Sequence, residues 1–97
     1  MDTTLDRIVH REPRLASFVH HGALTRIPRR PAIAATLYAA VAAELPSGVT
    51  LSETEVNNLL RPVWFDVSTL RRALVDHGHL RRSPDGARYE RVSPAGR

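Results

Sequence analysis

The sequence predicts an α+β fold that is mainly α: a winged helix-turn-helix-like domain, extended at its N-terminus by a helix and a short strand. Three observations predict it. Two short helical patterns with capping residues follow each other over residues 52–77, and a strong turn signal at residues 83–86 then separates two short strand patterns. An alanine-rich helical pattern over residues 31–45 precedes them. Helix, turn, helix and hairpin in this order is the arrangement of a winged helix.

The 97 residues, 42% of them hydrophobic, supply one domain with one small core. We expect a flexible N-terminal segment over residues 1–12, a single winged-helix-like domain over residues 13–92 and a C-terminal tail over residues 93–97. The lack of cysteine excludes disulfides and thiolate zinc sites. Charges interrupt the first 20 residues, unlike a signal peptide, and no apolar run is long enough to span a bilayer. A soluble cytoplasmic protein without a membrane partner is therefore expected.

The domain is expected to begin with a helix and a short strand. Pro13 fits the first turn of a helix that ends near residue 20, because a glycine follows at position 22. Residues 23–27 alternate apolar and polar side chains, which predicts a strand. The helix over residues 31–45 has an apolar residue at every fourth position, and its many alanines permit close approach of other elements. We predict that it is the central helix of the fold, with a dimer face as the alternative.

The next helix begins with a capping signal. Ser52 and Glu55 stand three residues apart, so side chain and backbone can satisfy each other's free donors in a capping box. Asn57 is expected to be half buried and hydrogen-bonded to the loop around Trp64, because a buried amide needs partners. The side chains expected to face the core are Val56, Leu59 and Leu60.

A second helix and a hairpin are expected to follow. The loop before them holds Trp64 and Phe65, which are predicted to fill the core between the two helices; an exposed Trp64 would instead mark a surface for a partner. Asp66 or Ser68 is expected to cap the helix over residues 67–77. The strand patterns around the turn predict a two-stranded wing over residues 80–92. The core side of this second helix is expected to hold Val67, Leu70, Ala73 and Leu74.

Positive charge is concentrated at the two ends of the chain. All 14 basic residues are arginine, and the net charge is +4. Residues 1–31 carry six arginines against three acids, residues 32–65 one against three, and residues 66–92 six against four. This layout predicts one or two positive faces that suit phosphate groups. An ordinary solvated surface is the alternative.

Eight side chains are predicted to contact DNA. Arginine suits guanine edges and phosphates because its planar group donates two parallel hydrogen bonds, and backbone amides at the start of a helix attract phosphate. The candidates on the helix over residues 67–77 are Ser68, Thr69, Arg71 and Arg72. The candidates on the wing are Arg81, Arg82, Arg88 and Arg91, which would contact the DNA backbone rather than the bases.

Both groups of arginines have a structural alternative. Arg71 or Arg72 would instead pair with an acid such as Glu53, Glu55 or Asp76 and hold the helices together. The wing arginines would instead protect an exposed strand edge from aggregation, a role that is compatible with DNA contact.

Neither a metal site nor an active site is predicted. The pairs His20–His21 and His77–His79 lack the spacing of a helical zinc motif, and no cysteine accompanies them. The sequence also lacks a glycine-rich phosphate loop and a nucleophile elbow. We therefore expect a protein that has no cofactor and is not an enzyme.

Four stretches together resemble a bacterial domain family of unknown function: FVHHGALTRIPRRP, SETEVNNLL, FDVSTLRRALVDHGHLRR and DGARYERV. That family occurs alone or fused to winged-helix transcription regulators of the ArsR and MarR kinds. The resemblance spans about residues 15–92 and implies a link to transcription regulation, with no catalytic residues to carry over. The matching positions are Glu55, Val56, Asn57, Asp66, Leu70, Arg71, Arg72, Leu74, Asp76, Gly78, Arg82, Gly86 and Tyr89.

The leading expectation is a transcriptional regulator that binds double-stranded DNA through the helix over residues 67–77 and the basic wing over residues 80–92. A homodimer is one assembly that would suit this role. The alternative is a protein-interaction module of the same fold, which docks another regulator or transcription component and does not itself bind DNA. A continuous positive face would favour DNA, whereas acids interleaved among the arginines would favour a protein partner.

Overall fold

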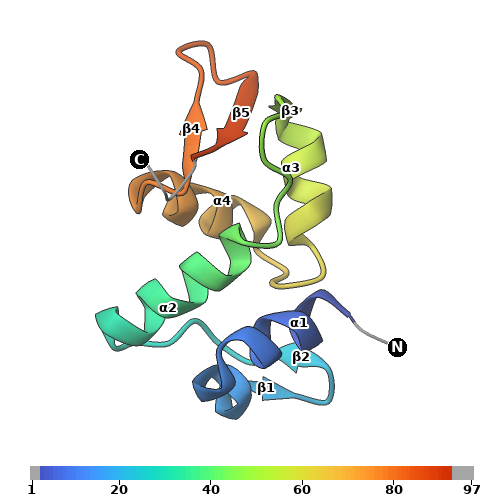
Figure 1. Ribbon diagram of the computed structural model, residues 1–97, viewed down its shortest axis with the longest axis vertical. Coiled ribbons are helices and arrows are strands. Elements are labelled where there is room, and N and C mark those ends of the chain that lie inside the picture. Colours follow the sequence, from blue (N-terminus) through green and yellow to red (C-terminus); the bar gives the residue numbers. More distant parts are fainter. Residues whose placement is uncertain (1–2, 93–97) are drawn as a thin grey trace.

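Helix α2, Pro31–Ala42, crosses the middle of the molecule between two groups of elements (Figure 1). The computed structural model describes residues 3–92, so the predicted C-terminal tail at residues 93–97 lies outside the described residues. Before α2 come α1, Thr4–Arg11, a 3-10 helix η1, Pro13–Phe18, and the strands β1, Val19–His20, and β2, Ala23–Leu24. After it come β3, Leu51–Ser52, α3, Glu53–Leu60, α4, Val67–Asp76, β4, Leu80–Arg82, and β5, Arg88–Arg91. The predicted α+β class is confirmed, since about half of the chain is helical and the strands are few and antiparallel.

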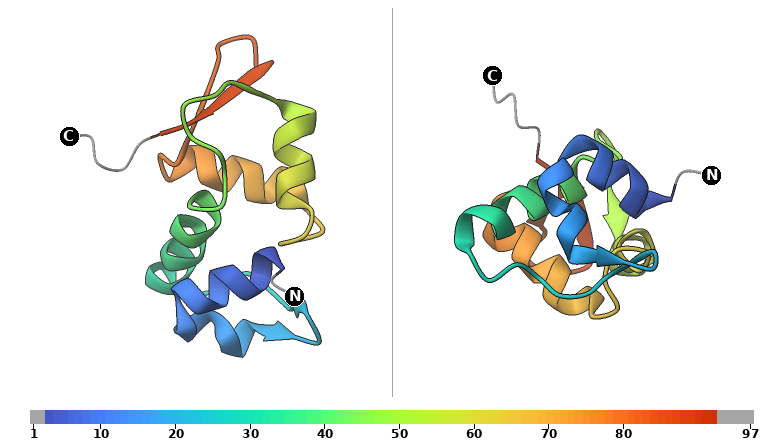
Figure 2. Two further views of the ribbon diagram at one scale, coloured as in Figure 1. Left: turned by 45° about the vertical axis from the view of Figure 1, so that its right-hand side comes forward. Right: turned by 90° about the horizontal axis from the view of Figure 1, so that it is seen from below.

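Helix α2 is the central helix, as predicted. It ends at Ala42, earlier than the predicted residue 45, and contacts α1 on one side and α4 on the other. Figure 2 shows the same order from two further directions, with α1 and the β1–β2 hairpin on the side of α2 away from β4 and β5. The alanines of α2 allow this close approach of two helices, because they add little bulk between the backbones.

The prediction of a flexible segment over residues 1–12 is wrong for residues 4–11, which form helix α1. The Thr3 hydroxyl accepts a hydrogen bond from the Asp6 N–H, and the Asp6 carboxylate accepts one from the Thr3 N–H. Leu5 and Ile8, three residues apart, lie on one side and are buried. A helix of eight residues is marginal alone in water, so packing on the rest of the fold stabilises it.

An ion-pair cluster joins α1 to the segment after α2. The Glu44 carboxylate accepts hydrogen bonds from Arg7 Nε at 2.7 Å and from Arg11 Nη2 at 3.1 Å, and only 10% of its side chain is exposed. Burial alone raises the pKa of Glu44, but the hydrogen bonds from the two arginines outweigh it and leave the pKa below its usual value. These ion pairs therefore add to the apolar contacts that hold α1 against the rest of the fold.

Replacing Glu44 with glutamine is expected to lower the free energy of unfolding by about 1–2 kcal/mol at neutral pH, because two partly exposed arginines lose their ionised acceptor. The pKa of Glu44 is lower in the folded than in the unfolded chain. Glu44 therefore contributes to the free energy of unfolding at a pH above the pKa of the unfolded chain, near 4.5. This contribution is lost as the pH falls through the pKa of the folded chain. Denaturant titrations of both proteins at several pH values measure this difference. A difference that stays constant in acid would contradict an electrostatic role.

The segment between α1 and α2 differs from the prediction in detail. The helix predicted over residues 13–20 is a 3-10 helix that ends at Phe18, and the strand predicted over residues 23–27 is limited to the two residues of β2. Strand β1 pairs with β2 in an antiparallel hairpin. His21 and Gly22 form its loop with φ of 52° and 77°, and a two-residue hairpin loop of this kind requires two positive φ angles.

Helices α3 and α4 begin at their predicted caps. The Ser52 hydroxyl accepts a hydrogen bond from the Glu55 N–H, and the Glu55 carboxylate accepts one from the Ser52 N–H, so the predicted capping box is confirmed. Asp66, rather than Ser68, caps α4. Local sequence thus fixes where both helices start.

The three strands β3, β5 and β4 form an antiparallel sheet in that order, so the β4–β5 hairpin pairs with the strand that leads into α3 (Figure 1). In the hairpin turn the Asp85 carboxylate accepts hydrogen bonds from the Ser83 hydroxyl and the Ala87 N–H, which lower the pKa of Asp85. The register places Leu80, Arg82, Tyr89 and Arg91 on one face of the hairpin. It places Arg81, Arg88 and Glu90 on the other face.

One apolar core joins the elements before and after α2. The prediction that Leu59 faces this core is wrong: 38% of Leu59 is exposed, because α3 packs against its neighbours on one side only. The largest side chains with less than 2% exposure are Ile8, Leu15, Leu37, Val41, Val56, Leu60, Leu70 and Leu74.

Within residues 3–92, no helix is both long and apolar enough to cross a membrane.

Candidate nucleic-acid interface

Arg71 lies between α3, α4 and β5, and only 12% of its side chain is exposed. Its Nη1 donates a hydrogen bond to Asn57 Oδ1, and its Nη2 lies 3.7 Å from Glu53 Oε1. Its guanidinium carbon is 6.0 Å from the centre of the Tyr89 ring. The structural alternative is therefore confirmed for Arg71. Asn57 is half buried as predicted, but it is bound to Arg71 and not to the loop around Trp64.

Arg91 is the second arginine that is bound inside the fold. Its Nη1 donates to the Leu45 carbonyl oxygen at 3.0 Å, an acceptor that lies just beyond the end of α2. Arg91 shares its face of the hairpin with the buried Leu80 and Tyr89. This hydrogen bond fastens β5 to the end of α2, and the predicted phosphate contact of Arg91 stays a prediction.

The start of α4 is occupied by its own cap. The Thr69 hydroxyl donates to Asp66 Oδ2 at 2.7 Å, and the Thr69 N–H donates to Asp66 Oδ1 at 3.2 Å. These hydrogen bonds hold the pKa of Asp66 below its usual value, so the carboxylate remains ionised. Thr69 is exposed and Ser68 half buried, but a negative charge stands where phosphate was predicted to bind. The hydroxyl and N–H of Thr69 are therefore bound to Asp66, and a phosphate contact at this helix start stays a prediction.

Arg81 forms an exposed ion pair across the hairpin. Its Nη2 lies 3.0 Å from Oε1 of Glu90, its partner in the register of β4 and β5. This pair covers the outer face of an edge strand, which agrees with the predicted role of protecting that edge. Its positive charge is partly cancelled, which weakens Arg81 as a phosphate contact.

Arg72 and Arg82 meet in a groove between α4 and the hairpin. The groove has a volume of about 370 Å³, and its lining also includes Val75 and Asp76 of α4. The bound Arg71 and the buried Tyr89 form the rest of its lining. Within residues 3–92, the guanidinium groups of Arg72 and Arg82 have neither an ion pair nor a hydrogen bond, so they can accept an outside anion.

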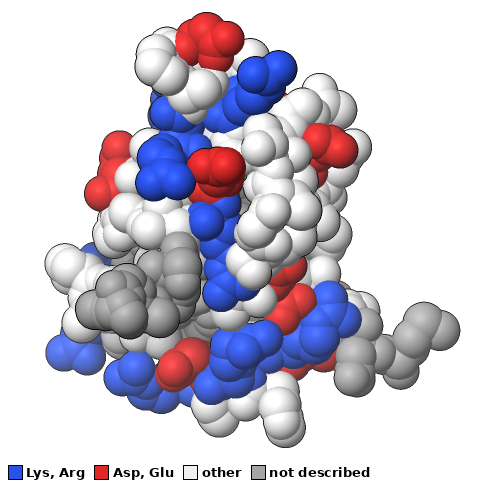
Figure 3. Space-filling view, turned by 45° about the horizontal axis from the view of Figure 1, so that its top comes forward, with Lys and Arg blue, Asp and Glu red and all other residues white. Residues whose placement is uncertain are grey.

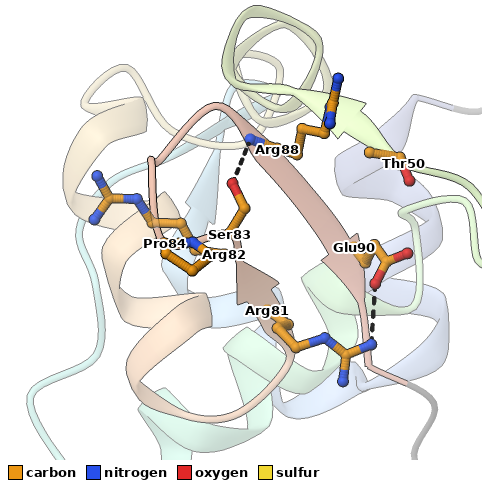
Figure 4. Close-up of a pocket in the computed structure, with 7 residues that line it drawn as sticks. All are labelled: Thr50, Arg81, Arg82, Ser83, Pro84, Arg88 and Glu90. Carbon is orange, nitrogen blue, oxygen red and sulfur yellow. Dashed lines mark hydrogen bonds and ion pairs between the residues drawn. The ribbon is translucent and has the colours of Figure 1, made fainter.

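The guanidinium group of Arg82 lies against the hairpin turn. Gly86 has a φ of 75°, and a side chain added there would collide with the guanidinium group of Arg82. Arg88, whose guanidinium group also has neither an ion pair nor a hydrogen bond within the described residues, lies on the opposite face of the hairpin. Figure 4 shows Arg81, Arg82 and Arg88 extending in different directions, with Arg81 beside Glu90. The hairpin therefore presents positive charge on both faces.

The charge on this side of the molecule is mixed. Figure 3 shows blue side chains over the hairpin with red side chains among them. Asp66 lies close enough to Arg72, and Asp85 close enough to Arg88, for each arginine to lower the pKa of the acid, although hydrogen bonds are the larger cause in both cases. The arginines therefore form separate positive points and not one continuous positive face, which is the arrangement expected of a protein-interaction module. The case for DNA rests instead on Arg72 and Arg82, whose guanidinium groups have no ion pair within the described residues.

The aromatic pair in the loop between α3 and α4 was predicted to fill the core, and for Phe65 this is wrong. Phe65 is 80% exposed, while Trp64 is half buried and packs against the core. The two rings lie 4.8 Å apart. The sequence signal for this prediction is weak, because a residue beside a helix cap can face the core or the solvent, depending on the path of the loop.

Three of the five histidines take part in ring contacts. The rings of His20 and His21 lie 4.1 Å apart, and the ring of His77 lies 4.7 Å from that of Tyr38. Over residues 3–92, no group of three or more histidine, cysteine, aspartate or glutamate side chains comes together in a way that would hold a metal ion.

Comparison with known proteins identifies a family but no closer relative. A search of the curated proteins and a search of the solved structures each return no match. A family model matches residues 23–91, which is most of the chain and includes every element from β2 to β5. The resemblance to a bacterial domain of unknown function is thereby confirmed. The chain belongs to the family described as an uncharacterized protein conserved in bacteria (DUF2087).

Proposed function

We propose that this domain is a winged helix that binds double-stranded DNA through the groove between α4 and the β4–β5 hairpin. The order of the elements supports the fold assignment. A helix, α2, precedes a strand, two helices and a hairpin, and the first strand pairs with the last one, so the sheet order is β3–β5–β4. In a winged helix the second helix of this pair enters the major groove and the hairpin lies alongside.

The observation that carries the proposal is that two arginines without an ion pair line the same groove. Arg72 projects from α4 and Arg82 from β4, and neither has an acid bound to it within residues 3–92. Arg72 lies on the exposed side of α4, with Val75 one turn further along, so these two side chains would face the base edges. Arg82 and Arg88 would contact phosphates on either side of the hairpin.

Arg72→Gln and Arg82→Gln are each expected to weaken binding to a labelled duplex by about 1–3 kcal/mol at low salt, because each removes one charged contact to DNA. Each loss should also reduce the slope of log affinity against log salt by roughly one. The matched control is Arg29→Gln, an exposed arginine before α2 with the same change of charge. Fluorescence anisotropy over a series of salt concentrations measures affinity and slope together.

Two results would contradict the proposal. One is a lack of binding to any duplex at low salt, and the other is an equal loss of affinity for Arg29→Gln, which would indicate only general attraction to a cationic chain. Either result would favour the alternative role, a protein-interaction module that docks another regulator and does not bind DNA. Sedimentation of the complex would also give the number of copies on each duplex, which tests the expected homodimer.

A further inference from the structure

A second surface of the domain combines an exposed aromatic ring with a groove. Phe65 is 80% exposed and packs against Trp64, with the two rings at 51° to each other. Such exposure leaves most of a large apolar side chain in water, and burying it would stabilise a complex. An exposed ring held by a partly buried neighbour is a ready contact for a partner, because little side-chain freedom is lost on binding.

The groove beside these rings has a volume of about 490 Å³ and is built from two separate parts of the chain. Gly22, Ala23 and Leu24 come from the β1–β2 hairpin. The other lining residues come from the loop after α3, namely Arg61, Pro62, Val63, Trp64 and Phe65. None of these residues lines the groove that holds Arg72 and Arg82. In Figures 1 and 2 this loop lies near the β1–β2 hairpin and away from the β4–β5 turn, so the two surfaces are distinct.

The charged side chain that lines this aromatic groove is positive. Among the described lining residues it is Arg61 alone, which also donates a hydrogen bond to Asn58 Oδ1 at 3.4 Å. Arg26 follows the β1–β2 hairpin and lies over the ring of Phe18. The nearest acid along the chain is Asp66, which is outside the groove lining and whose ionised carboxylate accepts both hydrogen bonds from Thr69 at the start of α4. The groove therefore complements an apolar segment that carries carboxylates.

We propose that the aromatic groove docks an acidic amphipathic helix of a partner protein. An apolar side chain of that helix would pack on Phe65 and Trp64, and a neighbouring carboxylate would pair with Arg61. A second copy of this chain is disfavoured as the occupant, because two such grooves would bring like charges together around Arg61. This docking site is independent of DNA binding, since it uses the opposite end of the α3–α4 unit from the β4–β5 turn.

Trp64 makes the test specific, because it is the only tryptophan in the chain. The probe is a synthetic amphipathic helical peptide of leucine, phenylalanine and glutamate without tryptophan, compared with the same peptide carrying lysine in place of glutamate. The acidic peptide is expected to shift the Trp64 emission to shorter wavelength in a saturable titration, and to bind at least about tenfold more tightly than the basic peptide. Equal binding of the two peptides, or no change with either, would overturn the proposal.

Variants assign the effect to the groove. Phe65→Ser is expected to weaken the acidic peptide by about tenfold or more, and Arg61→Gln to reduce the preference for acidic over basic peptide. Val49→Ser, at another exposed apolar position, is the control and should leave binding unchanged. Circular dichroism checks that the variants fold, which is expected because Phe65 and Val49 contribute little to the core. Unchanged affinity for Phe65→Ser, or self-association of the wild type that Phe65→Ser abolishes, would contradict the proposed occupant.

Discussion

Replacing Leu60 with alanine is expected to lower the free energy of unfolding by about 3–4 kcal/mol. Leu60 is fully buried at the end of α3, so the truncation removes apolar contacts and leaves a cavity that the core fills only in part. For a domain of this size, such a loss is a large fraction of the total stability. Urea titrations followed by circular dichroism measure it.

The matched control is the neighbouring residue of the same type. Leu59 is 38% exposed, and Leu59→Ala is expected to cost less than about 1 kcal/mol. The pair tests the rotation of α3 directly, because a helix turned by one position would bury Leu59 in place of Leu60. Similar losses for the two variants would contradict the packing described for α3.

Replacing Arg71 with alanine is expected to lower the free energy of unfolding by about 2–3 kcal/mol. The change removes the hydrogen bond to Asn57 and the ion pair to Glu53, and it leaves the partly buried Asn57 amide without its partner. It also removes the contact of the guanidinium group with Tyr89. Thermal and urea unfolding measure the loss, which is expected to persist at high salt because most of this side chain is shielded from water.

Arg72 provides the control within the same helical turn. Its side chain is exposed and has no ion pair within residues 3–92, so Arg72→Ala is expected to change the free energy of unfolding by less than about 0.5 kcal/mol. The effect on the proposed DNA binding is expected to differ from the effect on stability. Arg72→Ala should weaken the complex with DNA although the protein remains folded. Equal stability losses for Arg71→Ala and Arg72→Ala would contradict the assignment of one arginine to the fold and the other to the groove.

Much of the fold after residue 30 follows from local sequence signals. Ser52 with Glu55 and the Asp66 cap specify where α3 and α4 begin, and the turn at residues 83–86 specifies the hairpin. Each of these signals works within about four residues, so its meaning does not depend on distant parts of the chain. Helix α1 is the counterexample. Its cap at Thr3 was present in the sequence, but a helix of this length persists only because Leu5 and Ile8 find a core to pack against.

The candidate site was predictable only as a set of residue types. The sequence places arginines on α4 and on the hairpin, but a guanidinium group binds equally well to a DNA phosphate, a carboxylate or a backbone carbonyl. Arg71 and Arg91 find such partners 14 or more positions away in the chain, in Asn57 and in the Leu45 carbonyl. No pattern along the sequence marks those partners.

The sequence by itself determined the order of the helices and the hairpin from α2 onward, the caps of α3 and α4, the hairpin turn and the excess of arginine. Tertiary structure decided which arginines are occupied and which are open to a ligand. It also decided that Phe65 lies outside the core, although a fit inside was equally consistent with its position beside a helix cap. The physical reason is the sequence separation of the interacting residues. Caps and turns form between near neighbours in the chain. The burial and pairing of a long side chain depend on elements that only folding brings together.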